Sequence, residues 1–252
     1  MVIGVVGALS VALAAYTTLV VVPIARGLSA QIHDSGYPRT FEDLRLRLAS
    51  EDSARFIDEY MPTVQACRTR RELLKKSVTA VTVDGLYCEF GVGSGGTVNY
   101  IASLIPQKPI HGFDAFEGLP EDWREGYTKG AFATKIPQVL PNVVLHKGWF
   151  DQVLPGWKAH FPGPLAFVHM DADLYSSTKT VLDALADRMV PGTIIQFDEF
   201  FLYPGWKSNG EYKAFTEFRD AYRVEFEYLG YSTESGQVAI KIKRVSLPKA
   251  ER

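Results

Sequence analysis

Cysteine is scarce in this chain, and neither sign of charge dominates. Only Cys67 and Cys88 occur among 252 residues, and neither has the neighbours or the spacing of a metal site. A disulfide framework is therefore excluded, and reduced thiols in a cytosolic compartment are the default expectation. The formal net charge is -2 and no basic stripe runs along the chain, so the composition gives no support for nucleic-acid binding.

Repeats and low-complexity tracts are also absent from the sequence. Hydrophobic residues make up 46% of the chain, which leaves room for one domain with a sizeable core after the first thirty residues or so. We expect a membrane anchor over residues 1–25, a linker over 26–40, a helical cap over 41–80 and the main domain over 81–246.

The first 25 residues contain no charged side chain. A run of about 20 apolar residues can cross a bilayer, and a cleaved signal peptide would carry basic residues ahead of a shorter apolar stretch. We therefore expect a single-pass anchor; a buried helix or a misassigned start codon is the alternative. Arginines follow the segment and favour a cytoplasmic position for the domain: Arg26, Arg39, Arg45 and Arg47.

The rest of the chain alternates between short apolar runs and helical stretches, which is typical of an α/β fold. We predict a Rossmann-like, doubly wound, mostly parallel sheet of seven strands, preceded by N-terminal helices over residues 41–76 that break at Pro62. The last two strands, over residues 224–228 and 237–242, suit an antiparallel hairpin that closes the sheet. The other strands are expected at 85–90, up to 114, 143–146, 165–168 and 193–197, and further helices at 97–104, 177–187 and 212–222.

Two acidic clusters follow two of these predicted strands. Asp171 and Asp173 come after residues 165–168, and Asp198 and Glu199 come after residues 193–197. Ligands of such sheets bind beyond the carboxyl ends of the strands, so the two clusters should converge. Carboxylates repel one another unless a cation or a shared proton relieves them, which favours a hard divalent cation. Loop acids and helix caps are the plainer interpretation.

A glycine-rich turn after the first strand permits two interpretations. Gly91, Gly93 and Gly96, with Asp114 further on, fit the dinucleotide fingerprint of NAD-dependent oxidoreductases. Glu89 followed by Gly91, Gly93 and Gly95 equally fits the turn of S-adenosylmethionine-dependent methyltransferases. In both, glycines admit a ligand close to the backbone, and an acid accepts hydrogen bonds from ribose. An oxidoreductase has no need for the later acidic clusters, and its sheet rarely closes with an antiparallel pair.

In their order along the chain, these motifs resemble the signature of TylF/MycF-type sugar O-methyltransferases. The resemblance covers roughly residues 86–242. It is carried by the glycine turn, an Asp-x-Phe-x-Gly-Leu-Pro element from Asp114, Lys-Gly-Trp-Phe over residues 147–150, Asp-x-Asp-Leu-Tyr from Asp171, and the Asp198-Glu199 pair. The second acidic cluster of that family usually reads Asp-Asp-Tyr, whereas this chain has Asp-Glu-Phe. The N-terminal anchor is also foreign to the antibiotic-tailoring members.

The resemblance implies a class of reaction and a role for each matching residue. A methyl group would pass from S-adenosylmethionine to a hydroxyl of a sugar or similar polyol, and Asp173 would act as general base. A divalent metal, Mg²⁺, would be held by Asp171, Asp198 and Glu199. The cofactor would be bound by Glu89, Gly91, Gly93, Gly95, Asp114, Phe116 and Trp149.

Other residues are weaker candidates. His146 and His169 lie within apolar runs and are better explained as packed side chains than as bases. The long loop over residues 120–137 is expected to be a lid, because long loops at the ligand edge of a compact domain commonly close over a site. Residues 203–206 would line the acceptor pocket or merely turn the chain.

The acceptor stays open at this level. A sugar or glycan hydroxyl at the membrane face is our expectation, a catechol or phenol is its main rival, and a homo-oligomer is compatible with the sequence. A membrane-tethered binding protein without catalysis would be a different class of protein. The joint presence of the glycine turn, the ribose-binding acid and the metal-binding acids argues against it.

Overall fold

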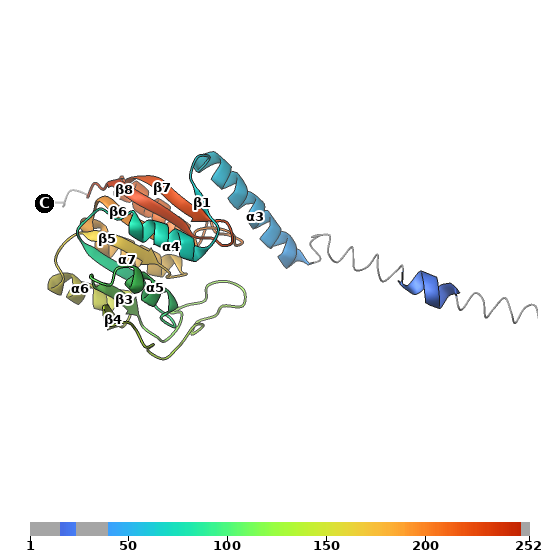
Figure 1. Cartoon of the computed structure of the whole chain (residues 1–252), viewed down its shortest axis with the longest axis horizontal. Coiled ribbons are helices and arrows are strands. Elements are labelled where there is room, and N and C mark those ends of the chain that lie inside the picture. Colours follow the sequence, from blue (N-terminus) through green and yellow to red (C-terminus); the bar gives the residue numbers. More distant parts are fainter. Residues whose placement is uncertain (1–15, 24–39, 248–252) are drawn as a thin grey trace, which may run out of the picture. The chain divides into compact units, whose positions relative to one another are not determined.

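The computed structural model describes residues 16–23 and 40–247 (Figure 1). The chain divides into two compact units, residues 1–47 and 48–252, with the boundary inside α3 (Phe41–Tyr60). The second unit contains the sheet and every residue of the site discussed below.

The sheet of the second unit has eight strands in the order β1-β7-β8-β6-β5-β2-β3-β4. From β6 to β4 the strands are parallel, whereas β8 runs antiparallel to both β6 and β7. The strands are β1 (Ala66–Cys67), β2 (Leu86–Phe90), β3 (Ile110–Asp114), β4 (Val143–Lys147), β5 (Leu165–Met170), β6 (Met189–Phe197), β7 (Glu225–Ser232) and β8 (Val238–Arg244).

Helices cover both faces because the central strands are apolar on both sides. One core cluster joins Phe90 and Val168 of the sheet to α6 (Phe150–His160), α7 (Tyr175–Leu185) and α8 (Glu211–Ala221). The other joins Phe167 to α4 (Arg70–Thr79) and α5 (Gly96–Leu104). The short 3₁₀ turn η2 (Ala186–Arg188) leads from α7 into β6. This layered arrangement leaves the carboxyl ends of β2, β3, β5 and β6 as the edge at which a site can form.

The predicted fold class is confirmed: the sheet is mostly parallel, is doubly wound and closes with the antiparallel β7-β8 pair. Two elements were missed. β1 is a two-residue strand that pairs with Tyr231 and Ser232 of β7, so the sheet has eight strands rather than seven. Helix α6 contains Pro155, which concealed its helical pattern, although a proline after the first turn still fits where neighbouring packing stabilises the helix.

The prediction of a single-pass membrane protein is wrong for the part of the chain that the structure describes. Among residues 16–23 and 40–247, no helix is both long and apolar enough to cross a bilayer. Within the predicted anchor the structure describes only residues 16–23, which include η1 (Thr17–Val21). Residues 1–15, 24 and 25 of that segment lie outside the described residues.

Candidate active site

The glycine turn between β2 and α5 comes into direct contact with the backbone that follows β5. Gly91, Gly93 and Gly95 have φ values of 93°, 52° and 83°, a region that favours glycine. A Cβ atom on Gly91 would lie 1.7 Å from the backbone oxygen of Asp171. Glycine at this position therefore allows the turn to lie against the first acidic segment.

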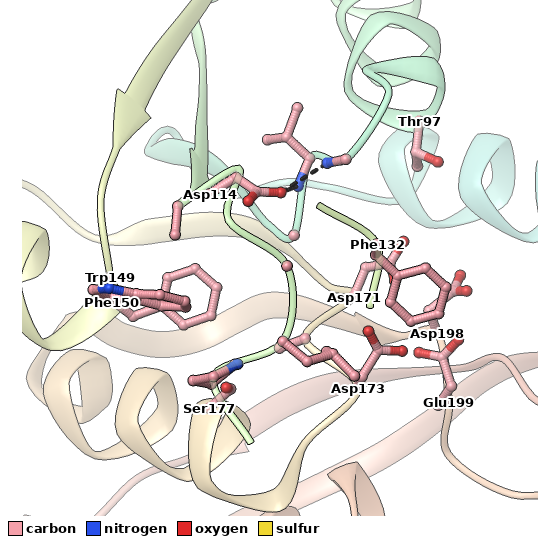
Figure 2. Close-up of a pocket in the computed structure, with 18 of the residues that line it drawn as sticks. Thr97, Asp114, Phe132, Trp149, Phe150, Asp171, Asp173, Ser177, Asp198 and Glu199 are labelled. Carbon is pink, nitrogen blue, oxygen red and sulfur yellow. Dashed lines mark hydrogen bonds between the residues drawn. The ribbon is translucent and has the colours of Figure 1, made fainter. Parts of the chain in front are cut away.

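Asp114, at the end of β3, fixes the shape of the same turn. Its Oδ2 accepts hydrogen bonds from the backbone N–H groups of Val92 at 2.9 Å and Gly93 at 2.8 Å, which Figure 2 shows. Its Oδ1 accepts from the N–H of Phe116 at 2.6 Å. A carboxylate offers about four lone-pair positions, so Asp114 can hold the turn and still accept a hydrogen bond from a ligand hydroxyl.

A cavity of about 940 Å³ opens beyond the carboxyl ends of these strands (Figure 2). Small-molecule sites typically occupy about 300–1,000 Å³. In Figure 2, Asp114 and Trp149 lie at some distance from the grouped acids, so the cavity has two chemically different ends. Eight of the residues predicted from the sequence line it: Gly91, Gly93, Asp114, Trp149, Asp171, Asp173, Asp198 and Glu199.

Three predicted cofactor residues lie away from the cavity wall. The side chain of Glu89 is fully buried beneath the floor. Gly95 caps the start of α5, where an added Cβ would meet Pro137. Phe116 is buried in the core cluster shared with α4 and α5. In this structure the three residues shape the site from behind and do not face the cavity.

Asp171, Asp173 and Glu199 converge at the acidic end of the cavity. One carboxylate oxygen from each lies within 4.8 Å of the other two. Burial and then the charge of Asp198 raise the pKa of Asp171 well above its usual range and that of Asp173 to about 7. Burial and the charge of Asp171 likewise raise the pKa of Glu199. The oxygen Oε2 of Glu199 is buried without a hydrogen-bond partner among the described residues.

Asp198 has a different environment, because two cationic groups face it. Its Oδ2 accepts a hydrogen bond from Nη1 of Arg70 at 2.7 Å, and its Oδ1 lies 3.5 Å from Nε2 of His169. Burial alone would raise the pKa of Asp198, but His169 and Arg70 outweigh it and lower the pKa. Asp198 is therefore the acid of the cluster that stays ionised most readily.

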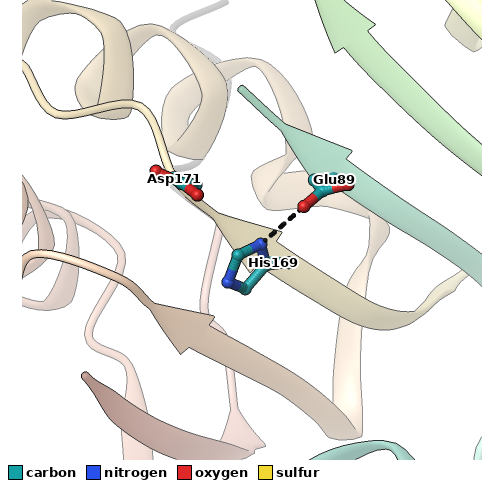
Figure 3. A group of neighbouring side chains, drawn as sticks. All are labelled: Glu89, His169 and Asp171. Carbon is teal, nitrogen blue, oxygen red and sulfur yellow. Dashed lines mark hydrogen bonds and ion pairs between the residues drawn. The ribbon is translucent and has the colours of Figure 1, made fainter. Parts of the chain in front are cut away.

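Behind Asp198, a buried ion pair joins β2 to β5. Nδ1 of His169 lies 3.0 Å from Oε1 of Glu89, and both side chains are fully buried (Figure 3). Burial would lower the pKa of His169, but hydrogen bonds to Asp198 and Glu89 raise it to about 10. The His169 imidazolium thus links the carboxylates of Glu89 and Asp198 beneath the floor of the cavity. His169 is a packed side chain, as the sequence predicts.

A second buried acid, Glu211, ties the two acidic turns together. It is the first residue of α8, and its Oε1 accepts a hydrogen bond from the N–H of Ala172 at 3.2 Å while Oε2 accepts from the N–H of Glu199 at 3.0 Å. Burial raises the pKa of this carboxyl group well above its usual range. Sequence reasoning missed Glu211 because an acid in the first turn of a helix is ordinary there.

The loop predicted to be a lid packs against the segment that carries Asp173. Leu119 and Trp123 form a small apolar cluster with Leu174, and the hydroxyl of Ser176 donates to Glu121 at 2.6 Å. Further along, Phe132 lines the cavity and lies in front of the acids in Figure 2.

The remaining sequence candidates lie elsewhere. Tyr203 and Trp206 are buried and do not line this cavity. His146 is also outside it, since its Nε2 lies 2.9 Å from Nδ1 of His111, within the sheet.

Residues 88–200 match the sequence model of a methyltransferase domain. Over 156 residues, 52% of the chain, the sequence is 30% identical to the 8-demethyl-8-(2,3-dimethoxy-alpha-L-rhamnosyl)-tetracenomycin-C 4'-O-methyltransferase of Streptomyces olivaceus. The match spans 60% of that relative's length.

Solved structures with a similar fold include two methyltransferases. The calicheamicin methyltransferase CalS11 has a TM-score of 0.54 at 24% identity, over 68% of this chain and 76% of its own. The O-methyltransferase NovP has a TM-score of 0.55 at 22% identity, over 69% of this chain and 80% of its own. The fold is therefore that of the Rossmann-like methyltransferases. The matched methyltransferase domain and the Streptomyces relative agree with the resemblance to TylF/MycF-type sugar O-methyltransferases that the motifs carry.

Proposed function

We propose that this chain transfers a methyl group from S-adenosylmethionine to a hydroxyl of a sugar that is held beside a divalent metal. The main support for the proposal is that two chemically different groups of residues line opposite ends of one cavity. The glycine turn and Asp114 line one end, and Asp171, Asp173, Asp198 and Glu199 line the other. The sugar acceptor rests on the similarity to the Streptomyces relative.

The glycine-turn end fits S-adenosylmethionine, which supplies an electrophilic methyl group on a sulfonium. Gly91 and Gly93 present backbone without side chains, and Asp114 retains acceptor capacity for ribose hydroxyls. Trp149 offers an aromatic surface at the same end, which suits an adenine ring. The β7-β8 pair and the later acids favour this cofactor over NAD.

The acidic end fits Mg²⁺, which supplies charge neutralisation and lowers the pKa of a bound hydroxyl. Glu199 has a buried oxygen without a partner among the described residues, and its carboxylate groups with that of Asp171. Asp171 and Asp198 already share one cation, the guanidinium of Arg70. We assign Asp171, Asp198 and Glu199 as the metal-holding residues, all with the oxygen donors that this ion prefers.

Asp173 is assigned as the general base. A carboxylate oxygen of Asp173 would accept the proton of the acceptor hydroxyl as the methyl group passes to the hydroxyl oxygen, the methyl–sulfur bond breaking to leave S-adenosylhomocysteine. Burial and the charge of Asp198 raise the pKa of Asp173 to about 7, which suits a base near neutral pH. Its φ of 57° is unusual for a residue other than glycine, and the segment is held by the packing of Leu174.

Two measurements test the proposal. Calorimetric titration of the full chain should give micromolar binding of S-adenosylhomocysteine and no heat with NAD; the reverse result contradicts the cofactor assignment. A transfer assay with labelled S-adenosylmethionine would then compare sugars and glycosides with catechols and simple phenols, with Mg²⁺ or with excess chelator. Methylation of phenols alone would overturn the sugar assignment, and full turnover in chelator would overturn the metal assignment.

A further inference from the structure

Arg70 places a positive charge inside the acidic end of the cavity. Its Nη1 lies 2.7 Å from Oδ2 of Asp198 and 3.8 Å from Oδ2 of Asp171. Asp198 is almost fully buried, at 4% exposure, whereas the Arg70 side chain is 42% exposed and lines the cavity. The guanidinium therefore reaches the acids from the side open to solvent.

The chain positions Arg70 with a helix cap. Thr69 is the cap of α4 and its hydroxyl accepts from the N–H of Glu72 at 3.2 Å, while Glu72 accepts from the N–H of Arg68 at 2.8 Å. These two hydrogen bonds fix where the helix starts. They also put Arg70 at the first helical position, where the helix dipole disfavours a cation. The tertiary contact with Asp198 gives a reason for a cation at a position that local preference opposes.

The two acids that Arg70 contacts are two of the residues assigned to the metal. They follow different strands, β5 and β6, and Arg70 comes from a helix outside the sheet. A guanidinium and a divalent ion both neutralise carboxylates, and two cations brought to the same carboxylates repel one another. A metal bound to Asp198 and Asp171 should therefore weaken or break the contacts that Arg70 makes with them.

We propose that Arg70 is a built-in counter-cation that competes with the divalent metal for Asp198 and Asp171 and so sets the metal affinity of the site. The inference rests on the proposed metal function. Arg70 is a positioning residue here. It holds Asp198 and Asp171 in place without metal, and metal binding displaces its guanidinium from Asp198. Removing the positive charge should tighten metal binding, whereas a residue that merely supported the site would weaken it when removed.

The test measures metal binding directly, with Mn²⁺ as the probe and electron paramagnetic resonance as the readout, on the full chain without cofactor or acceptor. Arg70→Met should bind Mn²⁺ at least about tenfold more tightly than the unaltered protein, because a close charge is removed. Arg70→Lys should fall between the two, since lysine keeps the charge but loses the fork geometry. Arg71→Met is the matched control, because the Arg71 guanidinium lies over the ring of Tyr100, 4.1 Å from its centroid, and its Mn²⁺ affinity should not change.

Equal or weaker Mn²⁺ binding in Arg70→Met, with unchanged S-adenosylhomocysteine affinity as proof of folding, overturns the proposal. A second measurement uses the unaltered protein: Mg²⁺ should shift the side-chain Nε–H resonance of Arg70, assigned with Arg70→Lys, and an unmoved resonance at saturating Mg²⁺ also overturns it. If no variant binds Mn²⁺ while S-adenosylhomocysteine still binds, the metal assignment fails together with this inference and the cofactor assignment stands. Tight Mn²⁺ binding that is the same in all variants overturns only the role of Arg70.

Discussion

Gly91 and Gly93 share a left-handed backbone but differ in what surrounds them. A Cβ on Gly91 would lie 1.7 Å from a backbone oxygen, whereas a Cβ on Gly93 would meet nothing within 4 Å. Gly91→Ala should therefore lower the free energy of unfolding by more than about 4 kcal/mol, and Gly93→Ala by about 1 kcal/mol, the cost of the conformation alone. Chemical denaturation of the ligand-free proteins measures both. Equal losses would show that the contact of Gly91 with the acidic segment is not a structural constraint.

His169 makes stability depend on pH with a definite sign. The pKa is raised from 6.5 to about 10 by Asp198 and Glu89, so the imidazolium stabilises the fold fully below about pH 6.5 and loses that contribution as pH rises toward 10. His169→Gln leaves Glu89 buried without its cation and should cost about 3–5 kcal/mol near pH 6. The difference from the unaltered protein should shrink between pH 7 and pH 10, measured by denaturation in chelator.

His111 provides the contrast for that experiment. Burial and the neighbouring His146 lower the pKa of His111 to about 4, so it is neutral in the fold at pH 7 and above. The stability difference between His111→Gln and the unaltered protein should be constant from pH 7 to pH 10. A difference that shrinks equally in both variants would place the pH dependence elsewhere than in the Glu89–His169–Asp198 chain.

For single residues, the sequence predicts the acids of the site but not the groups that pair with them. Asp171, Asp173, Asp198 and Glu199 could be predicted to converge because each follows a strand of a parallel sheet. The cationic group that faces them, Arg70, lies 128 residues from Asp198 in the sequence, and no local pattern links positions so far apart. Glu89 matches a cofactor-binding motif, yet its side chain pairs with His169, a buried residue of the neighbouring strand β5.

Helix α8 acts on the site through its first residue. Glu211 accepts hydrogen bonds from Ala172 and Glu199, one from each acidic turn. Glu211→Ala removes both bonds and should lower turnover about 10- to 100-fold, the usual effect of losing a group that orients ligating residues. Glu211→Gln keeps one accepting oxygen and should lose less. S-adenosylhomocysteine affinity should stay within about twofold in both, because no residue of α8 lines the cavity.

Loss of cofactor binding in Glu211→Ala would contradict this division of the cavity into two ends. Steady-state kinetics and calorimetry on the same preparations separate the outcomes.

The elements that could be predicted are those whose pattern is local. Helices α5, α7 and α8 start within two residues of the expected positions, since their apolar periodicity is clear. Helix α6 was missed because Pro155 and Gly156 interrupt its pattern, and its stability comes from Leu154 and Trp157 packing into the core. The two-residue strand β1 exists only through its pairing with β7, so no local signal could predict it.

For the molecule as a whole, ligands that bind only the folded state must stabilise it. S-adenosylhomocysteine at about 100 times its dissociation constant should add about 2.7 kcal/mol to the free energy of unfolding. For a domain of this size that corresponds to a rise in melting temperature of about 5–10 °C. Mg²⁺ should add a separate increment in the unaltered protein and none in Asp171→Ala. Thermal scans with each ligand alone and together measure this, and a Mg²⁺ increment that survives in Asp171→Ala would contradict the metal assignment.

The last strands of the sheet have a consequence for how copies of the molecule meet. β1 pairs only with Tyr231 and Ser232, at the end of β7, so the rest of this edge of β7 has no neighbouring strand in the part of the chain that the structure describes. Its side chains must therefore prevent a strand of another molecule from pairing there. Glu225 and Glu227 lie along this edge, in ion pairs with Arg244 and Lys243. Charges on a border strand deter another chain from adding its own strand there. Glu225 and Glu227 are thus expected to disfavour strand addition at this edge, a task separate from any chemistry at the opposite end of the strands.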